Sequence, residues 1–325
     1  MGEFYNNKKK KTKINLVSKF KICKMHKVSR EWFIDVPWGK IALVSWGVTT
    51  GEPALLVHGR QDSAATFIPL LQYLPEKYYY VAIDLPGHGK SDPFPISVML
   101  TRFHFLASVE YTMKHLRWNK FIYIAHSMGC EQGLFYNVIY PNRITKFIFL
   151  DPIPSLQRLQ VTDPQEYYKM FYKEYYENYH KYKSDDRVYS KSKARDAVTK
   201  ARGLSPELAD LVLHRNLKEV SDNSFKLSWD RRLKYPAPQN YPAEYYYQLF
   251  SLNIPPTLVV SATESAGYPQ GRKVAEKLIT DLKNNSNNFY IESVVGGHDV
   301  HLTAPAVVGG VVAKFLSSFK SMSKL

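Results

Sequence analysis

A serine stands between a short apolar run and a helix-like segment in the stretch Ile124-Ala125-His126-Ser127-Met128-Gly129. Such a tight connection between a strand and a helix holds its central residue in a strained backbone conformation, which costs about 1–3 kcal/mol. Small residues are needed two positions before and after Ser127, because larger side chains would collide with the strand or the helix, and Ala125 and Gly129 meet this need. The pattern predicts a nucleophile elbow, which exposes the serine hydroxyl at the top of a sheet and at a helix N-terminus. Because short serine-glycine patterns also occur by chance, its meaning depends on the rest of the chain.

The composition allows one large core, or a core with a small second domain. The chain has 325 residues, of which 45% are hydrophobic, and this is enough to bury a substantial interior. No apolar run reaches the length that spans a bilayer. The two cysteines, Cys23 and Cys130, provide neither a disulfide framework nor the spacing of a zinc site. We therefore expect no transmembrane segment, no metal and no other cofactor.

The net charge of +15 is concentrated at the two ends of the chain. Residues 1–30 contain ten lysines and arginines against a single acid, and residues 314–325 contain three lysines and no acid. The chain between them is close to neutral, so we expect no nucleic-acid partner. The 1–30 arm is predicted to be disordered and solvated, with contact to an anionic surface as the alternative.

The final three residues, Ser323-Lys324-Leu325, match the peroxisomal targeting signal that a soluble import receptor reads. The N-terminus lacks the apolar core of a secretory signal. We expect a peroxisomal location, with the import receptor as a partner. A cytoplasmic location is the alternative if the match is accidental.

Apolar runs alternate with helix-like segments along most of the chain. Two runs, 31–37 and 40–46, indicate an antiparallel hairpin, and six more follow at 54–57, 79–83, 121–124, 147–150, 257–260 and 289–291. Helices are expected near 64–74, 97–117, 128–140, 269–283 and 305–319. This alternation favours an α/β fold, with a mostly parallel eight-stranded sheet that has helices on both faces.

The interval 153–250 interrupts the alternation and contains no convincing strand. Its helix-like stretches include 167–176 and 205–213, and the second opens with a serine N-cap followed by proline. We expect an inserted helical cap at 153–250. The core would then comprise 31–152 and 251–320, with 321–325 as a C-terminal tail.

A serine needs a base before it can act as a nucleophile, and His298 is the candidate base. It follows two glycines after the last predicted strand and precedes Pro305, where the last helix is expected to start. His301 lies one helical turn further along and is expected to be either a support for this histidine or a bystander.

Developing negative charge on a substrate oxygen would need two backbone N–H donors. The residue after the nucleophile, Met128, supplies one of them. The other is expected from the loop after the third strand, where the N–H of Arg60 is best placed.

Two carboxylates compete for the role of orienting the base. Glu264 follows the strand at 257–260, and Asp151 ends the strand at 147–150, just before the insertion. Both keep the chain order serine, acid, histidine, and both could reach the Nδ1–H of His298. We favour Glu264, since Asp151 could instead hold the loop that leads into the insertion.

Together these residues resemble the α/β-hydrolase fold over roughly 31–320, and within it the kraken-type serine hydrolase-like proteins. The matching stretches are Val36-Pro37-Trp38-Gly39 with Trp46-Gly47, His58-Gly59 with Asp62, Tyr79-Tyr80-Val81-Ala82-Ile83-Asp84, Gly87-His88-Gly89 with Ser91, Trp118-Asn119-Lys120-Phe121, His126-Ser127 with Gly129, Leu150-Asp151, Arg231-Arg232-Leu233, and Gly296 with His298 and His301. The resemblance implies Ser127 as nucleophile and His298 as base, with poorly defined substrates and a peroxisomal location in some members. The chain departs from the family pattern at Ala125, where glycine is commoner, and at Ser265, which is not an aspartate.

The expected reaction is hydrolysis of a small-molecule ester or thioester through an acyl-enzyme. A serine rather than an aspartate at position 127 argues against haloalkane dehalogenation and epoxide hydrolysis. The alternative is a catalytically silent member of this fold that binds a small apolar ligand in the same pocket. This alternative stays open because the choice of acid, Glu264 or Asp151, is not settled.

Overall fold

The computed structural model describes residues 30–97, 99–183, 187–234, 236–265 and 269–318. The first strand begins at Arg30, the expected last residue of the N-terminal arm. Residues 1–29 and the tail at 321–325, with its Ser323-Lys324-Leu325 signal, lie outside the described residues, so the expectations for them stay predictions. In the described part of the chain, no helix combines the length and the apolar character needed to cross a membrane.

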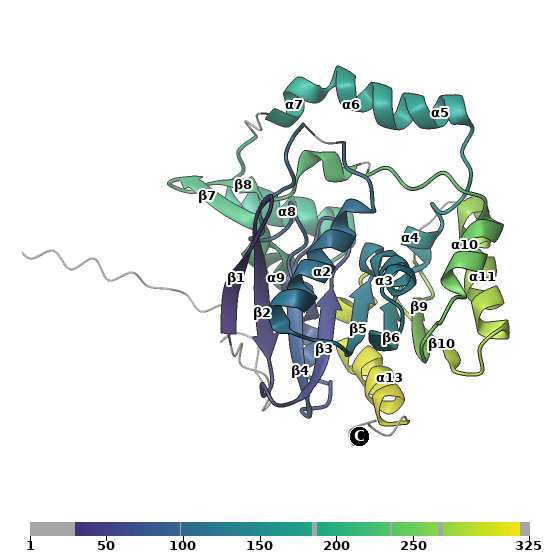
Figure 1. The fold of residues 1–325 in the computed structure, drawn as a ribbon. Helices are drawn as coiled ribbons and strands as arrows, with labels where there is room; N and C mark the ends of the chain where they lie inside the picture. The colour runs from purple at the N-terminus through teal and green to yellow at the C-terminus, as the bar shows by residue number, and fades with distance from the viewer. Residues whose placement is uncertain (1–29, 98, 184–186, 235, 266–268, 319–325) are drawn as a thin grey trace, which may run out of the picture.

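An eight-stranded sheet forms the centre of the molecule (Figure 1). In spatial order its strands are β1 (Arg30–Val36), β2 (Gly39–Trp46), β4 (Tyr78–Ile83), β3 (Glu52–Val57), β5 (Phe121–His126), β6 (Ile144–Leu150), β9 (Thr257–Ala262) and β10 (Phe289–Val294). β2 is antiparallel to both of its neighbours, and the other pairs are parallel. The expected mostly parallel sheet of eight strands is confirmed.

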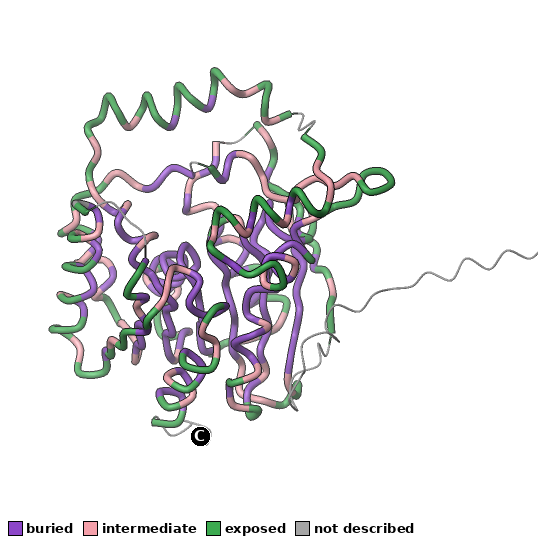
Figure 2. Tube along the Cα trace, turned by 180° about the vertical axis from the view of Figure 1, so that it is seen from behind, coloured by how far each residue is buried: buried purple, intermediate pink, exposed green. Residues whose placement is uncertain are grey.

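Helices cover both faces of this sheet. Neighbouring side chains along a strand point to opposite faces, so Leu55 and Val57 of β3 belong to one core cluster and Ala54 and Leu56 to the other. The first cluster is closed by α2 (His104–Leu116), α3 (Met128–Ile139), α10 (Ala243–Phe250) and α11 (Pro269–Asn284), and the second by α1 (Ile68–Leu71), α12 (Val300–Thr303) and α13 (Pro305–Ser318). Figure 2 shows that the buried trace is concentrated in the sheet.

The insertion, defined as residues 153–250, is more than a helical segment. Its helices are α4 (Ile153–Leu156), α5 (Pro164–Tyr168), α6 (Glu174–Glu177), α7 (Tyr179–Lys183), α8 (Lys191–Arg202), α9 (Pro206–Asn216) and α10. It also contains an antiparallel hairpin of β7 (Leu217–Ser221) and β8 (Ser224–Leu227), so the expectation of no strand in this interval is wrong. These strands are short and rich in polar residues, which hides their alternation, and Asn223 supplies the left-handed turn conformation with φ of 54°.

A buried ion pair holds α9 of the insertion against the sheet. The side chain of Asp84, fully buried after β4, accepts a hydrogen bond from Nη2 of Arg215 at 2.6 Å. Nη1 of Arg215 also donates to Oε1 of Glu31 on β1 at 2.8 Å. The carboxylate of Asp84 accepts the backbone N–H groups of Ala64 and Lys90 at 2.8 and 2.9 Å. Asp84 therefore ties together two loops of the core and one helix of the insertion.

We predict that Arg215→Met lowers the free energy of unfolding by about 3–5 kcal/mol, because it leaves the buried charge of Asp84 without its partner. Chemical denaturation followed by circular dichroism measures the change. The control is Lys277→Met, which removes an exposed pair with Asp281 on α11 and should leave the unfolding midpoint unchanged. Equal midpoints for the two variants would contradict the anchoring role of Arg215.

Candidate active site

Ser127 lies at the sharp turn between β5 and α3, with φ of 50° and ψ of −118°. This is a strained conformation for a residue with a side chain, as the sequence pattern predicts. The turn is fixed by hydrogen bonds from the N–H of Ser127 to the carbonyl of Leu150 and from the N–H of Cys130 to the carbonyl of Ser127, at 3.1 and 2.9 Å. Gly129 is required because a Cβ there would lie 2.3 Å from the carbonyl oxygen of Val57.

His298 joins Ser127 to a carboxylate at the end of a neighbouring strand. The Nε2 atom of His298 lies 2.9 Å from Oγ of Ser127, and its Nδ1 atom lies 2.6 Å from Oδ2 of Asp151. Because an ionised carboxylate can only accept, the proton of a neutral His298 belongs on Nδ1. Nε2 is then free to accept the hydroxyl proton of Ser127, which is the arrangement of a nucleophile, a base and an orienting acid.

The carboxylate of Asp151 is completely buried and is held by several donors. Its Oδ1 atom accepts the backbone N–H of Ala262 at 3.1 Å, and its Oδ2 atom accepts the hydroxyl of Ser265 at 2.5 Å. The backbone of Asp151 is also strained, with φ of 46°, and its N–H donates to the carbonyl of Val260 at 2.7 Å. These bonds compensate the desolvation of a buried charge and aim Oδ2 at His298.

The preference for Glu264 is contradicted by this geometry. The side chain of Glu264 is exposed, and among the described residues it makes no hydrogen bond or ion pair with His298. The chain bends after β9, where the N–H of Glu264 donates to the carbonyl of Gly296 at 2.9 Å. The next residue, Ser265, is turned inward and donates to Asp151. Ser265 therefore supports the acid, a role that the sequence analysis missed.

A cavity of about 720 Å³ opens at Ser127. Its wall on the side of the sheet includes Ser127, Met128, Arg60 and His298, and the insertion supplies the opposite wall. Its apolar lining residues include Met128, Val198, Ala201, Leu227 and Trp229. The lining arginines are Arg60, Arg102, Arg158 and Arg202. The core and the insertion therefore form the walls of this cavity together.

The loop after β3 passes directly beside Ser127. A Cβ on Gly59 would lie 2.9 Å from Cβ of Ser127, so only glycine allows this approach. The next residue, Arg60, lines the cavity, and its guanidinium donates to the carbonyls of Leu233 and Lys234 at 3.3 Å. The side chain of Arg60 thus contacts the insertion, while its backbone lies near Ser127.

Two buried histidines, His126 and His301, lie behind Ser127 and His298. His126 approaches the backbone carbonyl of His298 with its Nε2 atom at 3.0 Å, and its ring centroid is 4.1 Å from that of His301. Burial lowers the pKa of His126 and lowers that of His301 to about 3, so both rings are neutral near pH 7. His301, expected to be either a support for His298 or a bystander, packs on His126, the residue that contacts the His298 loop.

Cys130, directly after the elbow glycine, is a packed thiol. It is fully buried, and its Sγ atom donates to the carbonyl of Ala125 at 3.2 Å. Burial raises the pKa of this thiol well above its usual range, so it stays protonated. Cys130 is therefore no competitor for Ser127 as the nucleophile.

The sequence of this chain is similar to those of known proteins. The family model described as alpha/beta hydrolase fold matches residues 52–305. The chain is 28% identical over 299 residues to "Serine hydrolase-like protein" of Danio rerio, covering 90% of each chain. It is also 28% identical over 295 residues to "Serine hydrolase-like protein 2" of Homo sapiens, covering 87% of this chain and 92% of that protein.

A solved structure of a hypothetical protein from Pseudomonas aeruginosa has the same fold, with a TM-score of 0.73 and 24% identity. The match covers 89% of this chain and 98% of that one. Because the family model also spans well over half of the sequence, this chain belongs to the alpha/beta hydrolase fold family.

Proposed function

We propose that this protein is a serine hydrolase that cleaves a carboxylic ester or thioester through an acyl-enzyme. The family and its serine hydrolase-like relatives support a hydrolase. The observation that carries the proposal is the continuous hydrogen-bonded chain from Ser127 through His298 to Asp151, which opens into a cavity.

The first half of the reaction acylates Ser127. Its Oγ atom attacks the acyl carbon while Nε2 of His298 takes the hydroxyl proton, and Asp151 remains ionised and stabilises the resulting imidazolium. When the tetrahedral intermediate collapses, the carbon–oxygen or carbon–sulfur bond breaks, and His298 gives its proton to the alcohol or thiol that leaves.

The second half hydrolyses the acyl-enzyme. A water molecule attacks the acyl carbon as His298 takes its proton, and the bond to Ser127 then breaks while His298 returns a proton to Oγ. The products are a carboxylic acid and the free enzyme.

We propose that the backbone N–H groups of Arg60 and Met128 stabilise the oxyanion in both halves of the reaction. Both residues line the cavity beside Ser127, and Met128 begins α3, where the positive end of the helix dipole favours negative charge. Loss of one such donor typically lowers the rate by about 10²–10³. These donors belong to the main chain, so side-chain substitution leaves them in place.

The cavity supports a substrate with an apolar acyl group. Its volume of about 720 Å³ is in the usual range of small-molecule pockets. The apolar side chains of Val198, Leu227 and Trp229 come from the insertion and would contact the acyl chain, while the reacting carbonyl lies at Ser127.

We predict that a fluorophosphonate probe labels the wild-type protein and neither Ser127→Ala nor His298→Ala. The first variant lacks the nucleophile, and the second lacks the base that activates it. In-gel fluorescence measures labelling, and circular dichroism checks that each protein is folded. A folded wild-type protein that does not react would instead favour the catalytically silent, ligand-binding alternative.

We predict that Asp151→Asn lowers kcat on an ester by about 10³–10⁴-fold, because an asparagine amide cannot hold the imidazolium or its tautomer. Glu264→Gln is the matched control and should change kcat by less than about 3-fold, since Glu264 only lines the cavity. Steady-state kinetics on one chromogenic ester measures both. A large loss in Glu264→Gln with a small one in Asp151→Asn would overturn the choice of acid.

We predict that Ala201→Phe lowers kcat/KM about 10-fold or more for long-chain esters and leaves short-chain esters nearly unaffected. Ala201 lines the cavity from α8, so a larger side chain there reduces the space for the acyl group. Ala306→Phe, on the exposed side of α13, is the control. An equal effect of Ala201→Phe on every chain length would contradict an acyl site along α8.

A further inference from the structure

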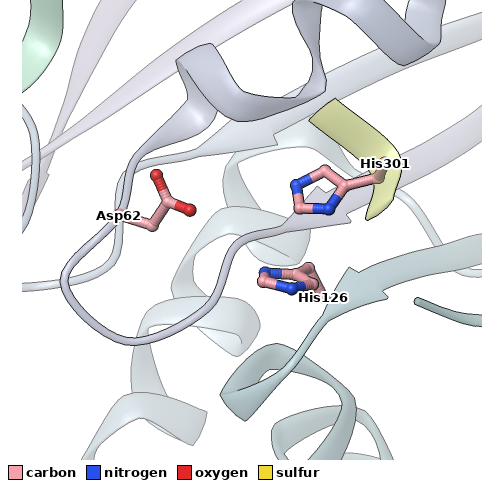
Figure 3. A group of neighbouring side chains, drawn as sticks. All are labelled: Asp62, His126 and His301. Atoms are coloured by element: carbon pink, nitrogen blue, oxygen red, sulfur yellow. The ribbon is translucent and has the colours of Figure 1, made fainter. Parts of the chain in front are cut away.

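Three buried side chains converge behind the catalytic candidates. Asp62 comes from the loop after β3, His126 from the end of β5, and His301 from α12 (Figure 3). All three are at most 2% exposed. One carboxylate oxygen and one nitrogen from each ring lie within 4.8 Å of one another, and the ring of His301 projects from α12 toward the side on which Asp62 lies.

This cluster holds more lone pairs than donors. The Nε2 atom of His126 faces the carbonyl of His298, which can only accept, so Nε2 carries the proton and Nδ1 keeps a lone pair. Among the residues that the structure describes, neither Nδ1 of His126 nor either nitrogen of His301 has a hydrogen-bond partner. A buried polar atom without a partner costs about 1–3 kcal/mol. Two adjacent histidines with unpaired ring nitrogens therefore indicate that a ligand binds between them.

The carboxylate oxygens of Asp62 can each bind a further ligand. Its Oδ1 atom accepts the N–H of Ser63 and its Oδ2 atom accepts Nη2 of Arg202, both at 3.0 Å. Each oxygen of a carboxylate can accept two bonds, so each retains a lone pair. These two donors also hold Asp62 in place, as hydrogen-bonded partners of metal ligands do.

The charges around the cluster favour a cation. Arg202 is shared between Asp62 and Asp299, whose Oδ1 atom lies 2.5 Å from Nη2 of Arg202. Two carboxylates therefore face one guanidinium, and the neutral histidines add no charge.

We propose that Asp62, His126 and His301 bind a divalent transition metal ion, with Zn²⁺ as the best match. Two imidazoles and one carboxylate form a ligand set that zinc prefers, with a fourth position for water. Asp62 and His126 line the cavity at Ser127, which gives the ion a path of entry.

Binding requires a small rearrangement of the ligands. Tetrahedral zinc with bonds of about 2.0–2.1 Å holds its ligand atoms roughly 3.4 Å apart, so the atoms now within 4.8 Å move together by about 1 Å. The contact of His126 with the carbonyl of His298 would transmit this movement to the base. If the proposed hydrolase function holds, Zn²⁺ should therefore inhibit turnover, whereas metal binding itself does not depend on that function.

The test is a titration of the metal-free full-length protein with Co²⁺, followed by visible absorption and then by competition with Zn²⁺. We expect one equivalent of Co²⁺ to give the intense absorption of a four-coordinate nitrogen and oxygen site, and Zn²⁺ to displace it. His301→Gln should weaken binding by about 100-fold or more, since loss of an outer partner alone costs about 10–100-fold.

Two control variants separate this site from the rest of the molecule. His214→Gln removes an exposed histidine of α9, and Ser127→Ala removes the nucleophile without touching the proposed ligands, so both should bind one equivalent as the wild type does. Binding by Ser127→Ala also makes the result independent of hydrolysis.

Three results would overturn the proposal. They are a wild-type protein without a one-equivalent site, a weak six-coordinate Co²⁺ spectrum, and unchanged affinity in a folded His301→Gln variant. If that variant does not fold, the wild-type spectrum decides between a four-coordinate site and none.

Discussion

The hydrogen bond between Asp151 and His298 is the interaction on which the rest of the site depends. The parallel strands β5, β6, β9 and β10 are neighbours in that order, so Ser127, Asp151 and His298 emerge at the same edge of the sheet. Two of these residues, Ser127 and Asp151, have positive φ angles, and strain of about 1–3 kcal/mol at each is sustained only by the surrounding structure. The bonds that Asp151 makes to Ala262, Ser265 and His298 hold that strained conformation and orient His298 toward Ser127.

Helices of the insertion stabilise the same edge of the sheet from outside. Arg202 of α8 binds both Asp62, two residues after Arg60, and Asp299, directly after His298. Arg215 of α9 binds Asp84 and, through it, the loop that begins at Ala64. The insertion thus restrains the loop of the base and the loop of the proposed oxyanion donor while it forms a wall of the cavity. Rigid placement of this kind is what a catalytic constellation requires.

The turn at Ser127 and the position of His298 beside it could be predicted from sequence because their signals are local. Small residues around Ser127 and glycines before His298 lie within a few positions of the functional side chain. Most strands of the central sheet could be predicted as well, since β3, β4, β5, β6 and β9 are largely buried apolar runs. The largely exposed β1 could be predicted from its pairing with β2 in a hairpin pattern. The hairpin β7–β8 could not, because its side chains are polar and its residues exposed or half-buried.

The acid could not be chosen from sequence, because Asp151 and Glu264 follow adjacent parallel strands. The choice depends on the bend after β9, where bonds to Val294 and Gly296 turn Glu264 outward. Ser265 was noted as a departure from the family pattern, but its role as a donor to Asp151 needed the three-dimensional structure. The cluster of Asp62, His126 and His301 was equally hidden, since its members lie on three segments far apart in the sequence.

The most direct test of this account is the proton NMR spectrum of the protein in water, at low field, where the Nδ1–H of a histidine bonded to a buried carboxylate resonates. We predict a resonance in the wild type and in Glu264→Gln that is lost in both Asp151→Asn and His298→Ala. This result would establish the bond between Asp151 and His298 without any knowledge of the substrate. A resonance that survives in Asp151→Asn, or one that disappears in Glu264→Gln, would contradict the account.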